Sequence, residues 1–224
     1  MKTKLHNKKI VIFDLDGTIL DTIGDITAAI NRALSKYGFP PRTVSETQSF
    51  LGNGSLMLMR RATSGKASDE LCYEIRELFR QEYSQNMCDS TTVYGGICEL
   101  IDELSDRGIA SAVVTNKDEK SAIPMIKHYF GGRIACVRGV RADTDRKPNP
   151  ENTLSVIASL GFTPDQALFI GDGIADFEVS KNAEIDFIPV GYGYTDSEKL
   201  QSLCGKTPCP TVSSLRDEIL KYLE

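Results

Sequence analysis

The feature of this sequence that most constrains its fold is a series of short, continuous apolar runs separated by helical patterns. The runs lie at residues 9–13, 109–114, 167–170 and 187–190, with a weaker one at 134–137. Continuous apolar runs of this length are typical of strands that are buried on both faces of a parallel sheet. Between them, residues 97–104 and 154–160 carry apolar side chains at helical spacing, and each pattern ends at a glycine. The alternation predicts a doubly wound, Rossmann-like α/β core.

One region interrupts this alternation. From residue 21 to residue 89 the apolar residues follow helical spacing, and no convincing strand pattern is present. Ile23, Ile26, Ile30 and Leu34 form one stripe, residues 71–79 form another, and residues 56–62 suit a shorter helix. A helical stretch of about 70 residues is too long for a crossover connection. We therefore expect an all-helical cap domain at 21–89, inserted into an α/β catalytic core formed by residues 1–20 and 90–224.

Composition and charge exclude several classes of function. The chain has 224 residues, with 26 Lys and Arg against 31 Asp and Glu, for a net charge of −5. This acidic balance argues against a nucleic-acid partner or an anionic membrane partner. No run approaches the roughly 18 apolar residues of a membrane-spanning helix. The basic start of the chain, at Lys2, Lys4, Lys8 and Lys9, is predicted to be a solvated tail.

The cysteines and histidines do not form a zinc-binding pattern. Six cysteines show no CxxC spacing, and the chain has only two histidines. The first apolar run is too short for the core of a secretion signal. We therefore expect reduced thiols and a cytoplasmic protein.

Two carboxylates follow the first predicted strand. Asp14 and Asp16 lie at its carboxyl end, where open α/β sheets bind their ligands, and Gly17 lets the chain turn sharply. Carboxylates gathered at a dry strand end repel each other unless a proton or a cation intervenes. By themselves, the two aspartates favour catalytic chemistry only moderately, because solvated aspartates can also cap the next helix.

Three further polar segments are expected at strand ends or in loops beside the sheet. Thr115 and Asn116 end the 109–114 run, with a hydroxyl and an amide that suit phosphate oxygens. Lys147 precedes a helical pattern, and Asp172 and Asp176 follow the 167–170 run. Each segment has a simpler structural explanation, as a helix cap, a surface charge or a turn. Four such coincidences in order favour a catalytic site.

In this order, the four segments resemble the four motifs of the haloacid dehalogenase superfamily of phosphohydrolases. The match spans nearly the whole chain, and the helical insertion lies between the first and second motifs, as in the first subclass of that superfamily. The residue after Asp172 is Gly173, where Ser is common in the superfamily. Both carboxylates of that motif are nevertheless present.

The resemblance implies roles for the catalytic residues. Asp14 would be the nucleophile that forms an aspartyl-phosphate, and Asp16 would be the general acid and then the general base. Lys147 would neutralise charge on the phosphoryl group and the nucleophile. Thr115 and the backbone at Asn116 would bind phosphoryl oxygens.

The resemblance also implies a metal site. The oxygen-rich residues favour a hard cation, and Mg²⁺ is expected. Asp14, Asp172 and the carbonyl oxygen of Asp16 would hold it. Asp176 would support the site through a water molecule or by contacting the direct ligands. Thr18 is expected to fix the loop after the first strand rather than to take part in catalysis.

The helical insertion is expected to select the substrate. Gly52, Asn53, Gly54 and Ser55 form a flexible loop directly before a helical run, and a helix N-terminus is a natural site for an anion. This loop, with residues 190–194, resembles segments of phosphoglycolate phosphatases. A small phosphorylated metabolite, in particular a phosphorylated carboxylic acid, is therefore the leading substrate.

Several alternatives remain open from the sequence. Related capped enzymes hydrolyse pyrophosphate, sugar phosphates or nucleotides, and some are phosphomutases. A non-catalytic binding module is disfavoured because every expected carboxylate is present. A receiver domain of a phosphorelay would not explain the large insertion. The assembly could be a monomer or a homodimer.

Overall fold

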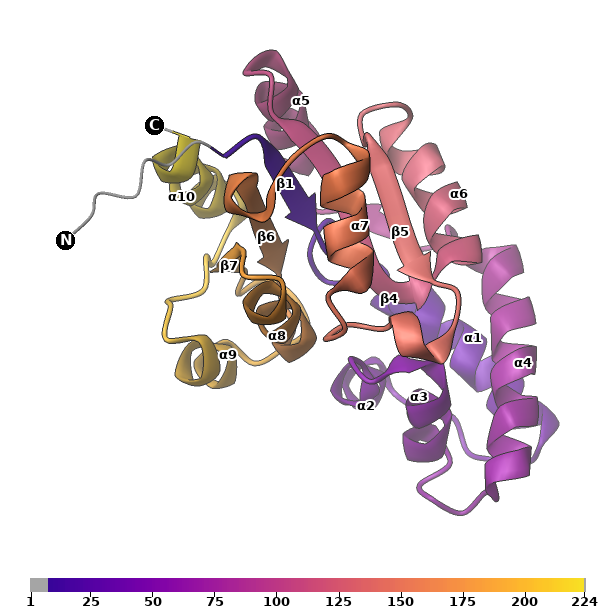
Figure 1. The fold of residues 1–224 in the computed structure, drawn as a ribbon. Coiled ribbons are helices and arrows are strands. Elements are labelled where there is room, and N and C mark those ends of the chain that lie inside the picture. Colours follow the sequence, from indigo (N-terminus) through magenta and orange to yellow (C-terminus); the bar gives the residue numbers. More distant parts are fainter. Residues whose placement is uncertain (1–7, 224) are drawn as a thin grey trace. The chain divides into compact units, whose positions relative to one another are not determined.

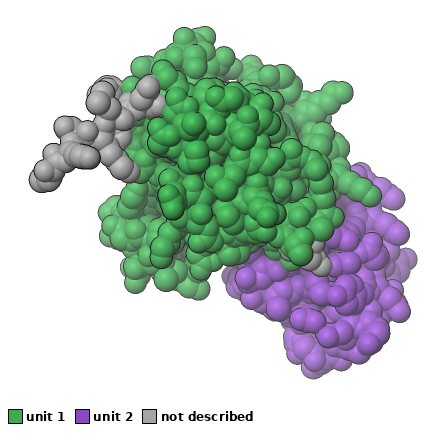
Figure 2. All heavy atoms as spheres, in the orientation of Figure 1, with its two compact units in different colours: residues 1–19, 93–224 green, residues 20–92 purple. Residues whose placement is uncertain are grey.

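The computed structural model describes residues 8–223, and Figure 1 shows their fold. The chain divides into two compact units, coloured separately in Figure 2. We call residues 1–19 and 93–224 the core unit and residues 20–92 the helical unit. The role of the helical unit as a cap stays a prediction.

The core unit contains a parallel sheet. Over residues 8–223 this sheet has five strands in the order β5-β4-β1-β6-β7. The strands are β1 (Ile10–Phe13), β4 (Ala110–Asp118), β5 (Cys136–Val140), β6 (Ala167–Gly171) and β7 (Asp186–Pro189). In the central register, Ile12 is paired with Ala112 on one side and with Phe169 on the other. This arrangement confirms the predicted doubly wound α/β core.

Helices flank this sheet. They are α5 (Ile97–Asp106), α6 (Glu119–Phe130), α7 (Glu151–Ser159), α8 (Ile174–Asn182), α9 (Ser197–Cys204) and α10 (Val212–Leu223), with short 3₁₀ turns at Asp143–Asp145 and Pro164–Gln166. Val156 of α7 and Val179 of α8 share one buried cluster with Ile12 and Phe169 of the sheet. Every residue of β1 is buried. Successive side chains of β1 point to opposite faces of the sheet. Because both faces are covered, every position of the strand is apolar, which explains the continuous apolar run.

The helical unit is formed by α1 (Ile23–Lys36), α2 (Val44–Phe50), α3 (Gly54–Ala62) and α4 (Asp69–Asn86). Much of each predicted stripe is buried, including Ile26 and Ile30 on α1 and Ile75 on α4, whereas Ile23 and Leu71 are half-buried. Helix α2 was not predicted as a separate helix. It starts with a capping box in which Thr43 and Glu46 exchange hydrogen bonds, a local signal that the apolar spacing does not contain.

Two very short strands lie at the ends of the helical unit. β2 (Leu20–Asp21) and β3 (Thr92–Val93) pair with each other, at the two points where the chain leaves the core unit and returns to it. The prediction of no strand from residue 21 onward is therefore wrong at Asp21. A pair of two-residue strands has too few positions to produce a periodic pattern in the sequence.

The basic start of the chain differs from expectation at Lys8, whereas Lys2 and Lys4 lie outside the described residues. Lys8 is 5% exposed, and its Nζ lies 2.8 Å from the carbonyl oxygen of Asp165 and 2.5 Å from the carboxylate of Asp186. A lysine can be buried when a carboxylate and a carbonyl oxygen replace the water molecules that are hydrogen-bonded to its ammonium group. The prediction of a solvated tail is wrong at this residue.

Two other sequence expectations concern cysteines and membranes. All six cysteines are free of disulfide bonds in the structure. Among the described residues, none of the helices combines the length and the apolar character needed to span a bilayer.

Candidate active site

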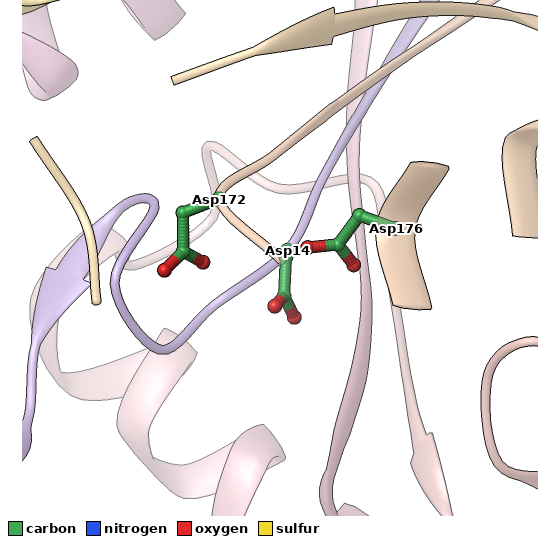
Figure 3. Close-up of side chains that lie close together, drawn as sticks. All are labelled: Asp14, Asp172 and Asp176. Atoms are coloured by element: carbon green, nitrogen blue, oxygen red, sulfur yellow. The ribbon is translucent and has the colours of Figure 1, made fainter. Parts of the chain in front are cut away.

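Three buried or half-buried carboxylates gather at the carboxyl end of the sheet. Asp14 follows β1, Asp172 follows β6, and Asp176 lies in the first turn of α8. One oxygen of each lies within 4.8 Å of the other two, and Figure 3 shows the three side chains close together. They meet because β1 and β6 are parallel neighbours, so their carboxyl ends lie side by side; the backbone N–H of Asp14 donates to the carbonyl oxygen of Ile170 at 2.9 Å.

A buried lysine lies against this carboxylate cluster. Lys147 is 5% exposed, and its Nζ lies 2.8 Å from Oδ1 of Asp14 and 2.6 Å from Oδ1 of Asp176. The same ammonium group donates to the carbonyl oxygen of Val114 at 3.1 Å. Lys147 comes from the loop before α7, so β1, β4 and α8 supply its partners only after the sheet has formed. An ammonium group beside Asp14 offsets part of the negative charge that an incoming anion would meet at this carboxylate.

Burial and mutual repulsion perturb the pKa values of these groups. Burial, followed by the charges of Asp176 and Asp14, raises the pKa of Asp172 to about 7. Burial and the nearby Asp14 charge also raise the pKa of Asp176. Burial opposes the charged form of Lys147, but the neighbouring Asp14 and Asp176 outweigh it and raise the pKa of the lysine. The three clustered carboxylates therefore carry more negative charge than Lys147 alone offsets.

The donor set fits a hard divalent cation. The three clustered groups offer only carboxylate oxygens, and a second positive charge would relieve the repulsion that raises their pKa values. Asp14, Asp172 and Asp176 are the side chains in reach of one such ion. The Asp16 carboxylate, in contrast, is paired with Lys117, whose Nζ lies 2.7 Å from its Oδ1. A metal-ligating role for the Asp16 carbonyl oxygen stays a prediction.

The Asp172 carboxylate is held by two segments from other parts of the chain. Oδ2 accepts a hydrogen bond from the backbone N–H of Tyr194 at 2.6 Å, and Oδ1 accepts one from the hydroxyl of Thr18 at 3.3 Å. Thr18 thus contacts a candidate metal ligand, in addition to any effect on its own loop. A Cβ atom on Gly193 would overlap the Cβ of Asp172 and the carbonyl oxygen of Gly17, so glycine permits this close approach.

No site role was predicted from the sequence for residues 193 and 194. Their signal is present in the run Gly191-Tyr192-Gly193-Tyr194, which is part of the segment that resembles phosphoglycolate phosphatases. A glycine between two aromatic residues after a strand can mark a close backbone approach. Only the tertiary structure shows that Asp172 is the group approached.

Thr115 and Asn116, at the end of β4, form hydrogen bonds with different partners. Thr115 is buried, and its hydroxyl oxygen accepts the backbone N–H of Lys117 at 3.2 Å. The Asn116 side chain is bonded to the backbone of Lys147, accepting from its N–H at 2.7 Å and donating to its carbonyl oxygen at 3.2 Å. The side-chain amide of Asn116 is thus occupied, and phosphate binding by its backbone and by Thr115 stays a prediction.

The predicted specificity loop lies in the helical unit. Gly52 and Gly54 have φ of 99° and 83°, in the left-handed region, and Ser55 is in the first turn of α3. The side-chain oxygen of Asn53 accepts from Nη2 of Arg61 at 2.8 Å, and Nη1 of Arg61 donates to the Phe50 carbonyl at 2.7 Å. Arg61 therefore braces this loop from within the unit. The role of the loop in substrate selection stays a prediction.

The fold and the site together define a Rossmann-like hydrolase with a carboxylate centre and a buried lysine. Residues 11–190 match the family of haloacid dehalogenase-like hydrolases. The chain belongs to this family. The family-level prediction from the four motifs is confirmed.

Several relatives share most of their length with this chain. The phosphoglycolate phosphatase of Psychrobacter arcticus is 32% identical over 96% of this chain and 97% of its own. Phosphoglycolate phosphatase 1 of Pseudomonas aeruginosa is 31% identical over 93% of this chain and 78% of its own. A solved structure from Lactobacillus delbrueckii subsp. bulgaricus, provisionally named a phosphoglycolate phosphatase, has a TM-score of 0.88 at 28% identity, covering 95% of this chain and 98% of its own.

Proposed function

We propose that this protein is a Mg²⁺-dependent phosphatase that acts on a small phosphorylated metabolite through an aspartyl-phosphate. The observation that carries the proposal is the ion pair between Lys147 and Asp14 inside a cluster of carboxylates. A lysine held against a carboxylate nucleophile offsets the repulsion between that carboxylate and a phosphate dianion. Membership in the hydrolase family supports the same chemistry.

The first step transfers the phosphoryl group to the protein. A carboxylate oxygen of Asp14 forms a bond to phosphorus while the bond from phosphorus to the leaving oxygen breaks. Asp16, as the general acid, gives its proton to that leaving oxygen. Lys147 and the hydroxyl of Thr115 bind the phosphoryl oxygens during the transfer.

The second step releases phosphate. Asp16, now a carboxylate, accepts a proton from water while the water oxygen bonds to phosphorus. The bond between phosphorus and Asp14 breaks, which regenerates the free carboxylate. Asp16 thus returns to its acid form for the next turnover.

We propose Mg²⁺ as the metal, held by Asp14, Asp172 and the Asp16 carbonyl oxygen, with Asp176 beside them. Bound Mg²⁺ would offset the repulsion among the carboxylates and polarise a phosphoryl oxygen. The excess of buried carboxylates over lysine in the cluster supports this assignment.

A phosphorylated carboxylic acid such as 2-phosphoglycolate is the proposed substrate. The support comes from relatives that carry the name phosphoglycolate phosphatase at 31–32% identity. The Gly52–Ser55 segment, which runs into the first turn of α3, offers backbone N–H groups that suit the second anionic group of such a substrate. We also propose a cytoplasmic location, because six free thiols stay reduced in that compartment.

Phosphate release from a panel of compounds tests this function. The panel includes 2-phosphoglycolate, pyrophosphate, sugar phosphates and nucleotides, each with Mg²⁺ or with EDTA, beside the Asp14→Asn variant. We expect metal-dependent release that is fastest with 2-phosphoglycolate and falls at least about 10³-fold in the variant, because the nucleophile is lost.

Other outcomes separate the alternatives. Preference for a different compound would retain the chemistry and overturn the substrate. Conversion of a sugar phosphate to an isomer without stoichiometric phosphate would identify a phosphomutase. A protein that changes no compound in the panel would be a binding module, and the proposed function would be wrong.

A further inference from the structure

Lys117 is a nearly buried lysine to which the proposed mechanism gives no role. It lies at the end of β4, and its side chain is 7% exposed. Its Nζ lies 2.7 Å from Oδ1 of Asp16, a residue 101 positions away in the chain. Removing an ammonium group from water is costly unless a charged partner compensates, so this contact is part of the folded site rather than a loose surface pair.

The two lysines of the site serve different carboxylates. Lys147 contacts Asp14 and Asp176, which belong to the cluster of candidate metal ligands. Lys117 contacts Asp16, which is not a member of that cluster in the described part of the chain. Lys147 therefore contacts the cluster of candidate metal ligands, whereas Lys117 holds Asp16 outside that cluster.

The backbone of Lys117 is also fixed. Its N–H donates to the hydroxyl oxygen of Thr115 at 3.2 Å, and the adjacent Asn116 is bonded to the backbone of Lys147. The ammonium group therefore projects from an anchored strand end. A lysine on such a base can hold a partner carboxylate in one orientation, whereas a lysine on a mobile loop could not.

We propose that Lys117 is a positioning residue that sets the side-chain rotamer of Asp16 for proton transfer to the leaving oxygen. The inference rests on the proposed function, because the orientation of Asp16 matters only if that residue transfers a proton. Proton transfer requires the donor and acceptor atoms within hydrogen-bond distance, and a displacement of about 1 Å can reduce the rate 10²-fold. Lys117 acts through Asp16 and does not itself contact the reacting atoms.

Leaving groups of different basicity give a readout specific to this role. An alkyl phosphate leaves as a strongly basic alkoxide and needs the proton, whereas p-nitrophenyl phosphate leaves as a stable phenolate and does not. For the Lys117→Met variant we expect kcat/KM to fall about 10²-fold on the alkyl phosphate that the wild type hydrolyses best and much less on p-nitrophenyl phosphate. Lys117→Arg, which keeps the charge, should recover part of the loss.

Two controls separate positioning from general damage. Lys120→Met removes an exposed lysine three residues further along the chain, and it should leave kcat/KM unchanged on both substrates. In an Asp16→Asn background, Lys117→Met should have no further effect, because the residue through which it acts is already disabled. An equal loss on both substrates, or a full further loss in the Asp16→Asn background, would overturn the proposal and indicate that Lys117 contacts substrate directly.

A crystal structure of the Lys117→Met variant tests the same point without turnover. We expect the Asp16 carboxylate to leave its wild-type rotamer. An unmoved Asp16 would overturn the positioning role even if the protein is an active phosphatase. Failure of the proposed function would instead appear as a wild-type protein that releases no phosphate, and the crystallographic result would still decide the role of Lys117.

Discussion

The side chain of Asn116 forms a reciprocal pair of hydrogen bonds with the backbone of Lys147. Oδ1 accepts the Lys147 N–H at 2.7 Å, and Nδ2 donates to the Lys147 carbonyl oxygen at 3.2 Å. This pair joins the end of β4 to the loop before α7, and that loop carries the lysine that contacts Asp14. The amide therefore fixes the backbone from which the ammonium group reaches the carboxylate cluster.

Asn116→Ala should weaken both stability and catalysis. Both polar backbone groups of Lys147 would lose their partner, which costs about 1–3 kcal/mol for a buried group, and displacement of the lysine should lower kcat about 10²-fold. Urea unfolding and phosphate release measure the two effects. As a control, Asn182→Ala removes one exposed hydrogen bond to the Pro148 carbonyl and should change stability by less than about 0.5 kcal/mol. Equal effects of the two variants would contradict this prediction.

Gly193→Ala should displace Asp172. The new methyl group would overlap the Cβ of Asp172 and the carbonyl oxygen of Gly17, so the carboxylate or the loop must shift. We expect a destabilisation of about 1–3 kcal/mol and a loss of activity of at least about 10²-fold. Gly132→Ala is the matched control, because a Cβ there meets nothing within 4 Å. A fully active Gly193→Ala protein would show that this close approach does not set the geometry of Asp172.

Asp172→Asn should have opposite effects on stability and activity. A neutral amide removes one of the buried like charges, so the metal-free variant should be more stable than the metal-free wild type at pH 8. The wild type should gain about 2.7 kcal/mol of stability at a Mg²⁺ concentration of 100 times Kd, and the variant should lose most of this gain together with its activity. Thermal unfolding with Mg²⁺ or EDTA measures both effects.

The control for that experiment is Asp106→Asn, which changes an exposed carboxylate on α5 of the same unit. It should retain the full Mg²⁺-dependent gain in stability. If Asp172→Asn also retained that gain, Asp172 would not hold the metal.

Asp25→Asn should destabilise the helical unit in a pH-dependent way. Burial raises the pKa of Asp25, but hydrogen bonds from Ser90 and Thr91 outweigh it and hold the pKa below its usual value of 3.8. Because the folded pKa is lower than the unfolded pKa, the carboxylate contributes its full stability above about pH 4 and loses it as the pH falls through the folded value. Asp25→Asn should therefore cost about 1–3 kcal/mol at pH 7 and progressively less below pH 4.

Urea unfolding at pH 7, 4 and 3 measures this difference. The control is Asp217→Asn, at a carboxylate that is 66% exposed, where the change in stability should be small at each pH. A cost of Asp25→Asn that stays constant down to pH 3 would contradict the assigned direction of the pKa shift.

Part of the candidate site was already visible in the sequence. Asp14, Thr115 and Asp172 each follow an apolar run, and strands that are parallel neighbours bring their carboxyl ends together, so their proximity follows from the fold class. The sequence did not indicate what holds these side chains. Thr18 and Tyr194 both bond to Asp172, over separations of 154 and 22 residues, and no local pattern relates such positions.

By itself, the sequence determined the α/β core, the position of the helical insertion in the chain, and the four polar segments at strand ends or in loops beside the sheet. These depend on local periodicity, which every short stretch of chain carries on its own. Only the tertiary structure decided that Lys117 pairs with Asp16 while Lys147 pairs with Asp14 and Asp176. Both lysines have the same chemistry, and the register of the strands and the paths of the loops determine which carboxylate each one reaches.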